Sequence, residues 1–61
     1  MKPRQIEVLQ RFANGEVMKE IAGEMGVTVT TINNYSKEIF DELEAEHRAH
    51  AVAIALRRGM I

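Results

Sequence analysis

Side chains that can bond to the edges of DNA bases recur at helical spacing between residues 29 and 37. They are Val29, Thr30, Asn33, Asn34 and Lys37. Asparagine can bond adenine through N6 and N7 together, and threonine can bond a base or contact a thymine methyl group. Asn33 projects from the same side of the helix as Thr30 and Lys37. We therefore favour Asn33 over Asn34 as a base-reading residue, one that contacts base edges. We predict base contacts for this set, and a solvated helix face is the alternative for each polar member.

Other kinds of chemistry find little support in the sequence. His47 and His50 are three residues apart with Glu44 and Glu46 nearby, a spacing that could hold a divalent ion. A third converging ligand is missing, so we interpret this segment as hydrated surface and expect no metal and no cofactor. The chain has no cysteine, no glycine-rich phosphate loop and no Ser/His/Asp set. We therefore expect that the protein is not an enzyme.

The run from Ile21 to Ile32 supplies the elements that would present the base-reading side chains. Ala22 is small enough for a second helix to approach closely, and Gly26 can take the positive φ that ends a helix. Ile32, with Ile21 and Met25, fills the wedge between two crossing helices. This order of side chains is typical of a helix-turn-helix, whose second helix enters the DNA major groove.

Apolar residues at helical spacing predict an all-α fold along the whole chain. We expect four helices, near residues 3–13, 18–25, 29–44 and 48–58. Pro3 suits a first helical turn, Asn14-Gly15 ends that helix, and the Thr28 hydroxyl can cap the third helix at the amide of Thr31. No residue from 27 to 58 breaks a helix, so the last two helices could also be continuous.

The expected core is the set of apolar residues that share one face of each of the first three helices. It comprises Val8, Leu9, Phe12, Ile21, Ala22, Met25, Ile32, Tyr35, Ile39 and Leu43. With 61 residues, the chain can form one domain with a small core.

The last apolar segment carries two faces at helical spacing. Ala51, Val52, Ala55 and Leu56 form one face, which we expect to pack on the domain. The other face would be covered by a second copy of the chain across a two-fold axis, because small residues let two helices approach closely. The predicted dimer interface is His50, Ala53, Ile54 and Arg57. A terminal helix with some exposed apolar residues is the alternative.

Charge is unevenly distributed, although the net charge is only −1. Residues 1–37 hold five Lys or Arg against four Glu, whereas residues 38–50 hold five acids against one Arg. A basic footprint is the usual mark of a nucleic-acid binder. Here the acid is gathered just past the predicted reading helix, where it could sit away from phosphates.

The chain resembles the LuxR/GerE type of helix-turn-helix domain from about Pro3 to Ile61. The matching pieces are Pro-Arg-x-x-Glu-Val-Leu at 3–9, Asn14-Gly15, Lys-Glu-Ile-Ala at 19–22, Thr31-Ile32 and the closing run at 51–61. The resemblance implies a four-helix transcription-regulator domain that dimerises through its last helix. In this family the positions of Thr30, Asn33, Asp41 and Glu42 are often basic, and a Ser or Thr usually stands at Val17.

The resemblance also guides the assignment of contacts to the DNA backbone. Lys19 lies in the matching Lys-Glu-Ile-Ala segment and is the first candidate for a phosphate contact, followed by Arg4 and Thr28. The resemblance covers nearly the whole chain, so we predict a single helix-turn-helix domain over residues 1–61. We therefore expect a stand-alone domain or a fragment of a longer protein.

These observations predict a sequence-specific transcriptional regulator that binds double-stranded DNA as a homodimer. No segment approaches a membrane span and no signal-peptide core is present, so we expect a cytoplasmic protein without a membrane partner. The alternative is a protein–protein interaction module that docks on a transcription factor or a polymerase subunit. The neutral reading helix and the acidic stretch at 38–46 motivate that alternative, in which a regulatory protein is the partner.

Overall fold

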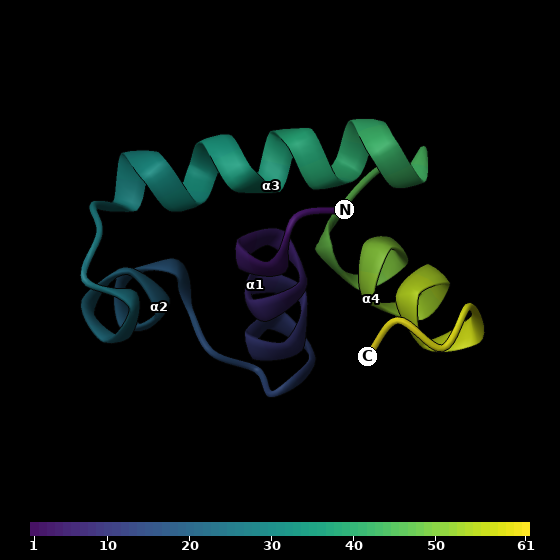
Figure 1. Cartoon of the computed structure of the whole chain (residues 1–61), viewed down its shortest axis with the longest axis horizontal. Coiled ribbons are helices and arrows are strands. Elements are labelled where there is room, and N and C mark those ends of the chain that lie inside the picture. The colour runs from purple at the N-terminus through teal and green to yellow at the C-terminus, as the bar shows by residue number, and fades with distance from the viewer.

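The computed structural model describes residues 1–61 and contains four helices and no strand. They are α1 (Pro3–Ala13), α2 (Met18–Met25), α3 (Val29–Leu43) and α4 (Arg48–Arg57). In Figure 1, α3 runs along one side of the molecule, α1 lies beneath it, and α2 and α4 lie toward opposite ends. The predicted all-α class is confirmed, and the predicted boundaries hold to within one residue. None of these helices is long and apolar enough to cross a membrane.

The connection between α3 and α4 is a loop, so the alternative of one continuous helix is wrong. Glu44 takes a left-handed conformation with a φ of 55°, which ends α3. The next amide, of Ala45, donates to the carbonyl of Phe40 at 2.9 Å. Ala45 is half-buried and packs against the core, and this contact accompanies a turn that contains neither glycine nor proline.

The turn between α2 and α3 follows the predicted helix-turn-helix pattern. Gly26 has a φ of 69° and its amide donates to the carbonyl of Ala22. The hydroxyl of Thr28 accepts a hydrogen bond from the amide of Thr31 at 3.1 Å, which caps α3 as expected. Ile32 is fully buried among core residues, so α3 packs against α2 immediately after the tight turn that joins the two helices.

The core lies where the four helices meet, and the sequence pattern predicted all ten of its buried apolar residues, eight on the first three helices and two on α4. They are Val8, Leu9, Phe12, Ile21, Ala22, Ile32, Ile39, Leu43, Ala51 and Ala55. Met25 and Tyr35 are only half-buried at its margin. Two polar residues, Gln5 and Ser36, are also buried, and the sequence pattern did not single them out.

One arginine of α1 pairs with three carboxylates, of which one lies in α2. Arg11 forms ion pairs with Glu7 at 3.2 Å and with Glu16 at 3.1 Å, and it also pairs with Glu24 of α2. The hydrogen bond to Glu16 is the largest influence on this guanidinium and raises the pKa of Arg11 above its ordinary value. The pair with Glu24 links α1 to α2, the first helix of the helix-turn-helix.

Candidate nucleic-acid interface

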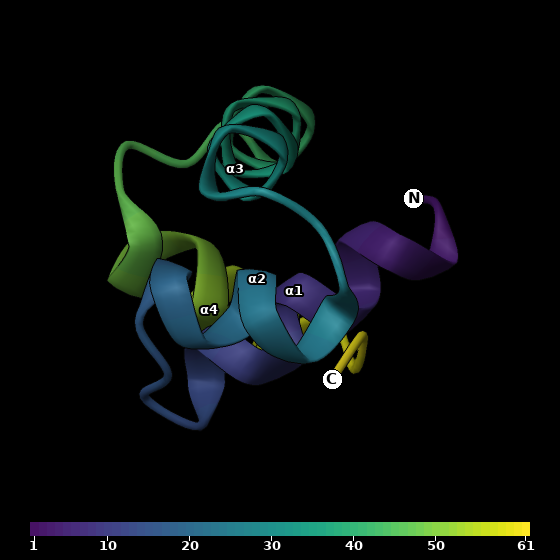
Figure 2. The same cartoon turned by 90° about the vertical axis from the view of Figure 1, so that its left-hand side faces the viewer.

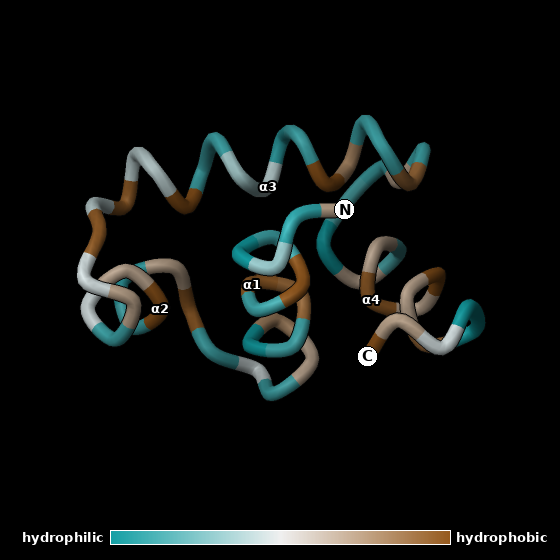
Figure 3. Tube along the Cα trace, viewed as in Figure 1, coloured by the Kyte–Doolittle hydropathy of each residue, from teal (hydrophilic) through white to brown (hydrophobic).

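The predicted base-reading residues lie together on the exposed side of α3. Val29, Thr30, Asn33, Asn34 and Lys37 are all exposed. Figure 3 shows hydrophilic residues along the outer side of α3 and hydrophobic residues along the side that faces the other helices. Figure 2, turned by 90°, shows α3 end-on at one edge of the molecule. A helix at the edge with a polar outer face has the shape that a major groove admits.

The buried side of α3 fixes which residues point outward. Ile32, Ser36, Ile39 and Leu43 are buried at spacings of three and four residues. The Ser36 hydroxyl donates to the carbonyl of Ile32 at 2.9 Å, so this buried polar group is satisfied within the helix. A serine thus sits at a core position without a cost in hydrogen bonding, which explains why a search for apolar residues missed it.

The predicted phosphate contacts come from three different segments. Arg4 lies in the first turn of α1, Lys19 in the first turn of α2, and Thr28 in the turn before α3; all three are exposed. The Thr28 hydroxyl is already engaged with Thr31, whereas the lysine and the arginine form no ion pair within the chain. Both cations are therefore available to an external anion.

The start of α2 is capped without the customary hydroxyl. Val17 occupies the cap position, and its amide donates to the Glu20 carboxylate at 3.0 Å. This is the reciprocal half of a capping box, in which an acid in the first turn satisfies the amide that precedes the helix. The Glu20 carboxylate therefore satisfies the Val17 amide within the chain.

The outer face of α4 differs in one respect from the prediction. Only Ala51 and Ala55 of α4 are fully buried. Their small side chains let α4 approach α1 and α3 closely. Leu56, expected to pack on the domain, lies about 100° around the helix from Ala55 and is 57% exposed. That part of the prediction was wrong. The exposed leucine adds to the apolar surface that a partner could cover.

The four predicted dimer residues differ in their exposure and in the side of α4 on which they lie. Arg57 is exposed, and His50 and Ala53 are half-buried on the side away from the core. Ile54 is also half-buried, but it packs against the core cluster. Ala53 therefore stands near the centre of the outer face, whereas Ile54 lies at its flank.

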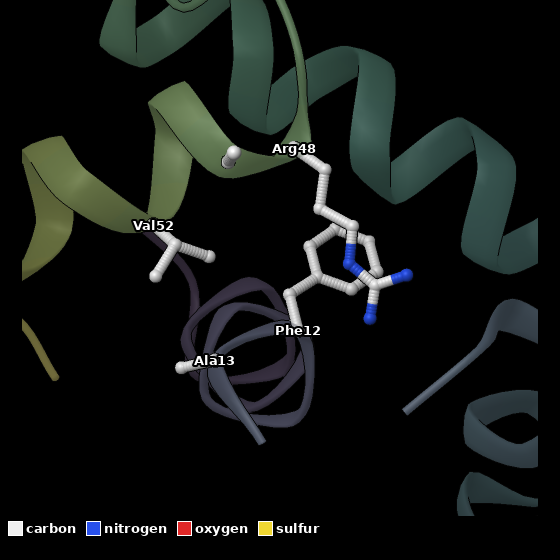
Figure 4. Close-up of a pocket in the computed structure, with 5 residues that line it drawn as sticks. Phe12, Ala13, Arg48 and Val52 are labelled. Carbon is white, nitrogen blue, oxygen red and sulfur yellow. The ribbon is translucent and has the colours of Figure 1, made fainter. Parts of the chain in front are cut away.

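A shallow cavity of about 420 Å³ lies where α4 meets the end of α1. It is lined by Phe12, Ala13, Arg48, Ala49 and Val52. Figure 4 shows the Arg48 guanidinium lying over the Phe12 ring, 4.3 Å from the ring centroid. Arg48 also donates to the carbonyl of Glu16. This pair anchors the start of α4 on α1, and no pattern in the sequence indicated it.

The two histidines serve as caps at the start of α4. The Nδ1 atom of His47 accepts from the amide of His50 at 3.3 Å, and Nδ1 of His50 accepts from the amide of Glu46 at 3.1 Å. No group of three or more His, Cys, Asp or Glu side chains is arranged to hold a metal ion. These contacts account for the spacing of the histidines through helix capping.

The acidic residues at the end of α3 differ in their partners. Glu38 accepts from the Gln5 side chain at 3.4 Å, and Glu42 pairs with the amino terminus of Met1 at 3.6 Å. Asp41 is exposed and its carboxylate has neither a hydrogen bond nor an ion pair. The N-terminal segment thus engages two of the three carboxylates, and one stays free on the outer side of the helix.

Comparison with known proteins finds similarity to bacterial regulatory proteins, both in a family model and in individual relatives. Residues 2–55 match the model for bacterial regulatory proteins of the luxR family. Transcriptional regulatory protein DesR of Bacillus subtilis is 36% identical over 56 residues, which cover 92% of this chain and 28% of DesR. Probable transcriptional regulatory protein NarL of Mycobacterium tuberculosis is 33% identical over 61 residues, covering 100% of this chain and 28% of NarL.

A relative of a different overall length shares the same segment. HTH-type transcriptional regulator AlkS of Alcanivorax borkumensis is 36% identical over 58 residues, which cover 95% of this chain and 7% of AlkS. The chain thus spans less than a third of the length of each of these three relatives. No solved structure gives a significant match.

Proposed function

Because this chain belongs to the luxR family of bacterial regulatory proteins, we propose that it is a sequence-specific DNA-binding domain that regulates transcription. In this proposal α3 enters the major groove and two copies bind together. The observation that carries it is the outer face of α3, where five side chains suited to base edges are exposed together on one helix.

Base readout falls to the first two and a half turns of α3. Asn33 and Thr30 are the proposed readers, with Asn34 and Val29 beside them, because recognition helices contact bases mainly through their N-terminal residues. Lys37 is placed to reach a guanine or a phosphate. Lys19, Arg4 and Thr28 would fix the register on the DNA backbone without reading sequence.

The proposed dimer forms through the outer face of α4. Ala53 and His50 lie on that face with Arg57, and Ile54 borders it. We add Leu56 to this set because 57% of its surface is exposed on the same helix. A two-fold arrangement would present two α3 helices to half-sites about one helical turn of DNA apart.

Selection from a randomised duplex library at about 50 mM salt tests this proposal. Enrichment of a two-fold-symmetric site is the expected result. A titration of the selected duplex should show the affinity falling as salt rises, in proportion to the number of phosphates neutralised. A folded protein that enriches no sequence and binds no duplex at low salt would refute the proposal.

The same experiment separates DNA binding from the second candidate function. A protein-docking module is favoured by one observation, the exposed acidic residues near the end of α3, which oppose binding to phosphates. That function predicts no DNA binding at any salt concentration. Its partner would be a regulatory protein or polymerase subunit with a basic surface.

A further inference from the structure

We propose that Asp41 limits how much of α3 contacts DNA, so that the end of the helix is held off the duplex. The inference rests on the proposed function, since it concerns how α3 is seated in the groove. It assigns to Asp41 a negative role: the residue weakens binding to every sequence equally, and the choice of bases stays with residues 29–37. Three features support this role, namely the position of the side chain, its lack of a partner and the charge of the DNA.

Asp41 lies on the same outward stripe of α3 as the predicted readers. Thr30, Asn34, Lys37 and Asp41 follow one another at spacings of four, three and four residues, which keeps them on one side of a helix. All four are exposed, and the buried stripe of α3 lies on the opposite side. At 1.5 Å per residue, Asp41 stands about 16 Å along the axis from Thr30.

No group within the chain neutralises this carboxylate. The neighbouring acids are engaged with the N-terminal segment, Glu38 with Gln5 and Glu42 with the amino terminus. Asp41 has no such partner, so its full charge faces outward. A duplex that met α3 along its whole length would bring phosphates close to this charge.

The size of the effect follows from Coulomb's law. A carboxylate about 7 Å from one phosphate in water weakens binding by about 2–3-fold, and a dimer presents two such residues. Removing the charge should therefore tighten binding about 5–10-fold at low salt. The gain should shrink at high salt, because the screening length falls well below 10 Å above 0.1 M.

The test compares two variants that change the net charge equally. Asp41→Asn removes the outward charge of α3, and Glu46→Gln removes one charge from the exposed loop that follows α3. Affinity is measured by fluorescence anisotropy for the library-selected duplex and for an unrelated duplex of the same length, at about 50 and 300 mM salt. Circular dichroism of both variants checks that they are folded.

The expected result is that D41N binds both duplexes about 5–10-fold more tightly at low salt, with the same sequence preference, whereas E46Q changes affinity less than 2-fold. A third variant, Asp41→Lys, should add a phosphate contact and steepen the salt dependence by about 0.9 per copy.

Two results would overturn the inference while leaving DNA binding intact. Equal gains for D41N and E46Q would mean that only net charge matters. A loss of affinity for D41N, or a changed base preference, would mean that Asp41 contacts DNA directly, as a carboxylate does when it accepts from cytosine N4. If the wild-type protein binds no duplex, the proposed function has failed and this inference fails with it.

Discussion

Replacement of Gly26 by alanine isolates the cost of the turn that creates the helix-turn-helix. Gly26 has a φ of 69°, and a Cβ added there meets no heavy atom within 4 Å. The penalty is therefore backbone strain alone, about 1–2 kcal/mol for a residue with a Cβ. Alanine also restricts the unfolded chain, which offsets about 0.4–1 kcal/mol. We expect a net loss of about 0–1.6 kcal/mol.

Gly23 provides a matched control three residues earlier. It lies in the interior of α2 with an ordinary helical backbone, it is exposed, and a Cβ there also meets nothing within 4 Å. Gly23→Ala should stabilise the fold by about 0.5–1 kcal/mol. Because both variants add the same methyl group, their difference in stability measures the strain at Gly26, about 1–2 kcal/mol.

Urea denaturation followed by circular dichroism gives the free energy of unfolding of both variants. In thermal unfolding, each kcal/mol corresponds to about 4–8 °C for a domain of this size. Equal stability of Gly26→Ala and Gly23→Ala would refute this account, since the positive φ would then not explain the glycine in the turn.

Three further changes probe the proposed interfaces and the anchor of α4. Leu56→Glu should weaken dimerisation about 30-fold or more, because covering the exposed part of two leucines is worth about 2–3 kcal/mol; sedimentation equilibrium tests this, and an unchanged dimer would remove Leu56 from the interface. Arg48→Ala should cost about 1–2 kcal/mol of stability in urea denaturation, because the side chain no longer covers Phe12 or bonds the Glu16 carbonyl. Lys19→Gln should reduce the salt dependence of DNA binding by about 0.9 for each phosphate that the lysine neutralises, without altering base preference; an unchanged slope would exclude a phosphate contact by this lysine.

The helix-turn-helix was predictable because its determinants are local. The conformation of Gly26 and the cap at Thr28 depend on residues within a few positions, and the burial of Ile32 follows from helical spacing. The exposure of Asn33 and Lys37 follows from the same spacing once the buried face is known. The sequence therefore predicted the fold class and which residues share the outer face of α3.

Features set by tertiary contact were not predictable in the same way. The left-handed Glu44 has no glycine or proline beside it, and its conformation goes with the packing of Ala45 on the core. Arg11 pairs with Glu24 thirteen residues away, and no periodicity reveals that choice over other acids. The two faces of α4 were hard to separate, because both carry alanines and Leu56 resembles a core residue in type.

The weak anchoring of α4 links its packing to the proposed activity. Only two alanines of α4 are fully buried, and such small side chains remove little apolar surface from water. Arg48 and the half-buried Val52 and Ile54 supply the other attachments. A second copy that covers the outer face would stabilise the folded form by mass action, so dimerisation and the docking of α4 would strengthen each other. In the proposed dimer, a change at Arg48 would then lower DNA affinity without touching DNA, because the two α3 helices would reach their half-sites only if the α4 pair held them at a fixed separation.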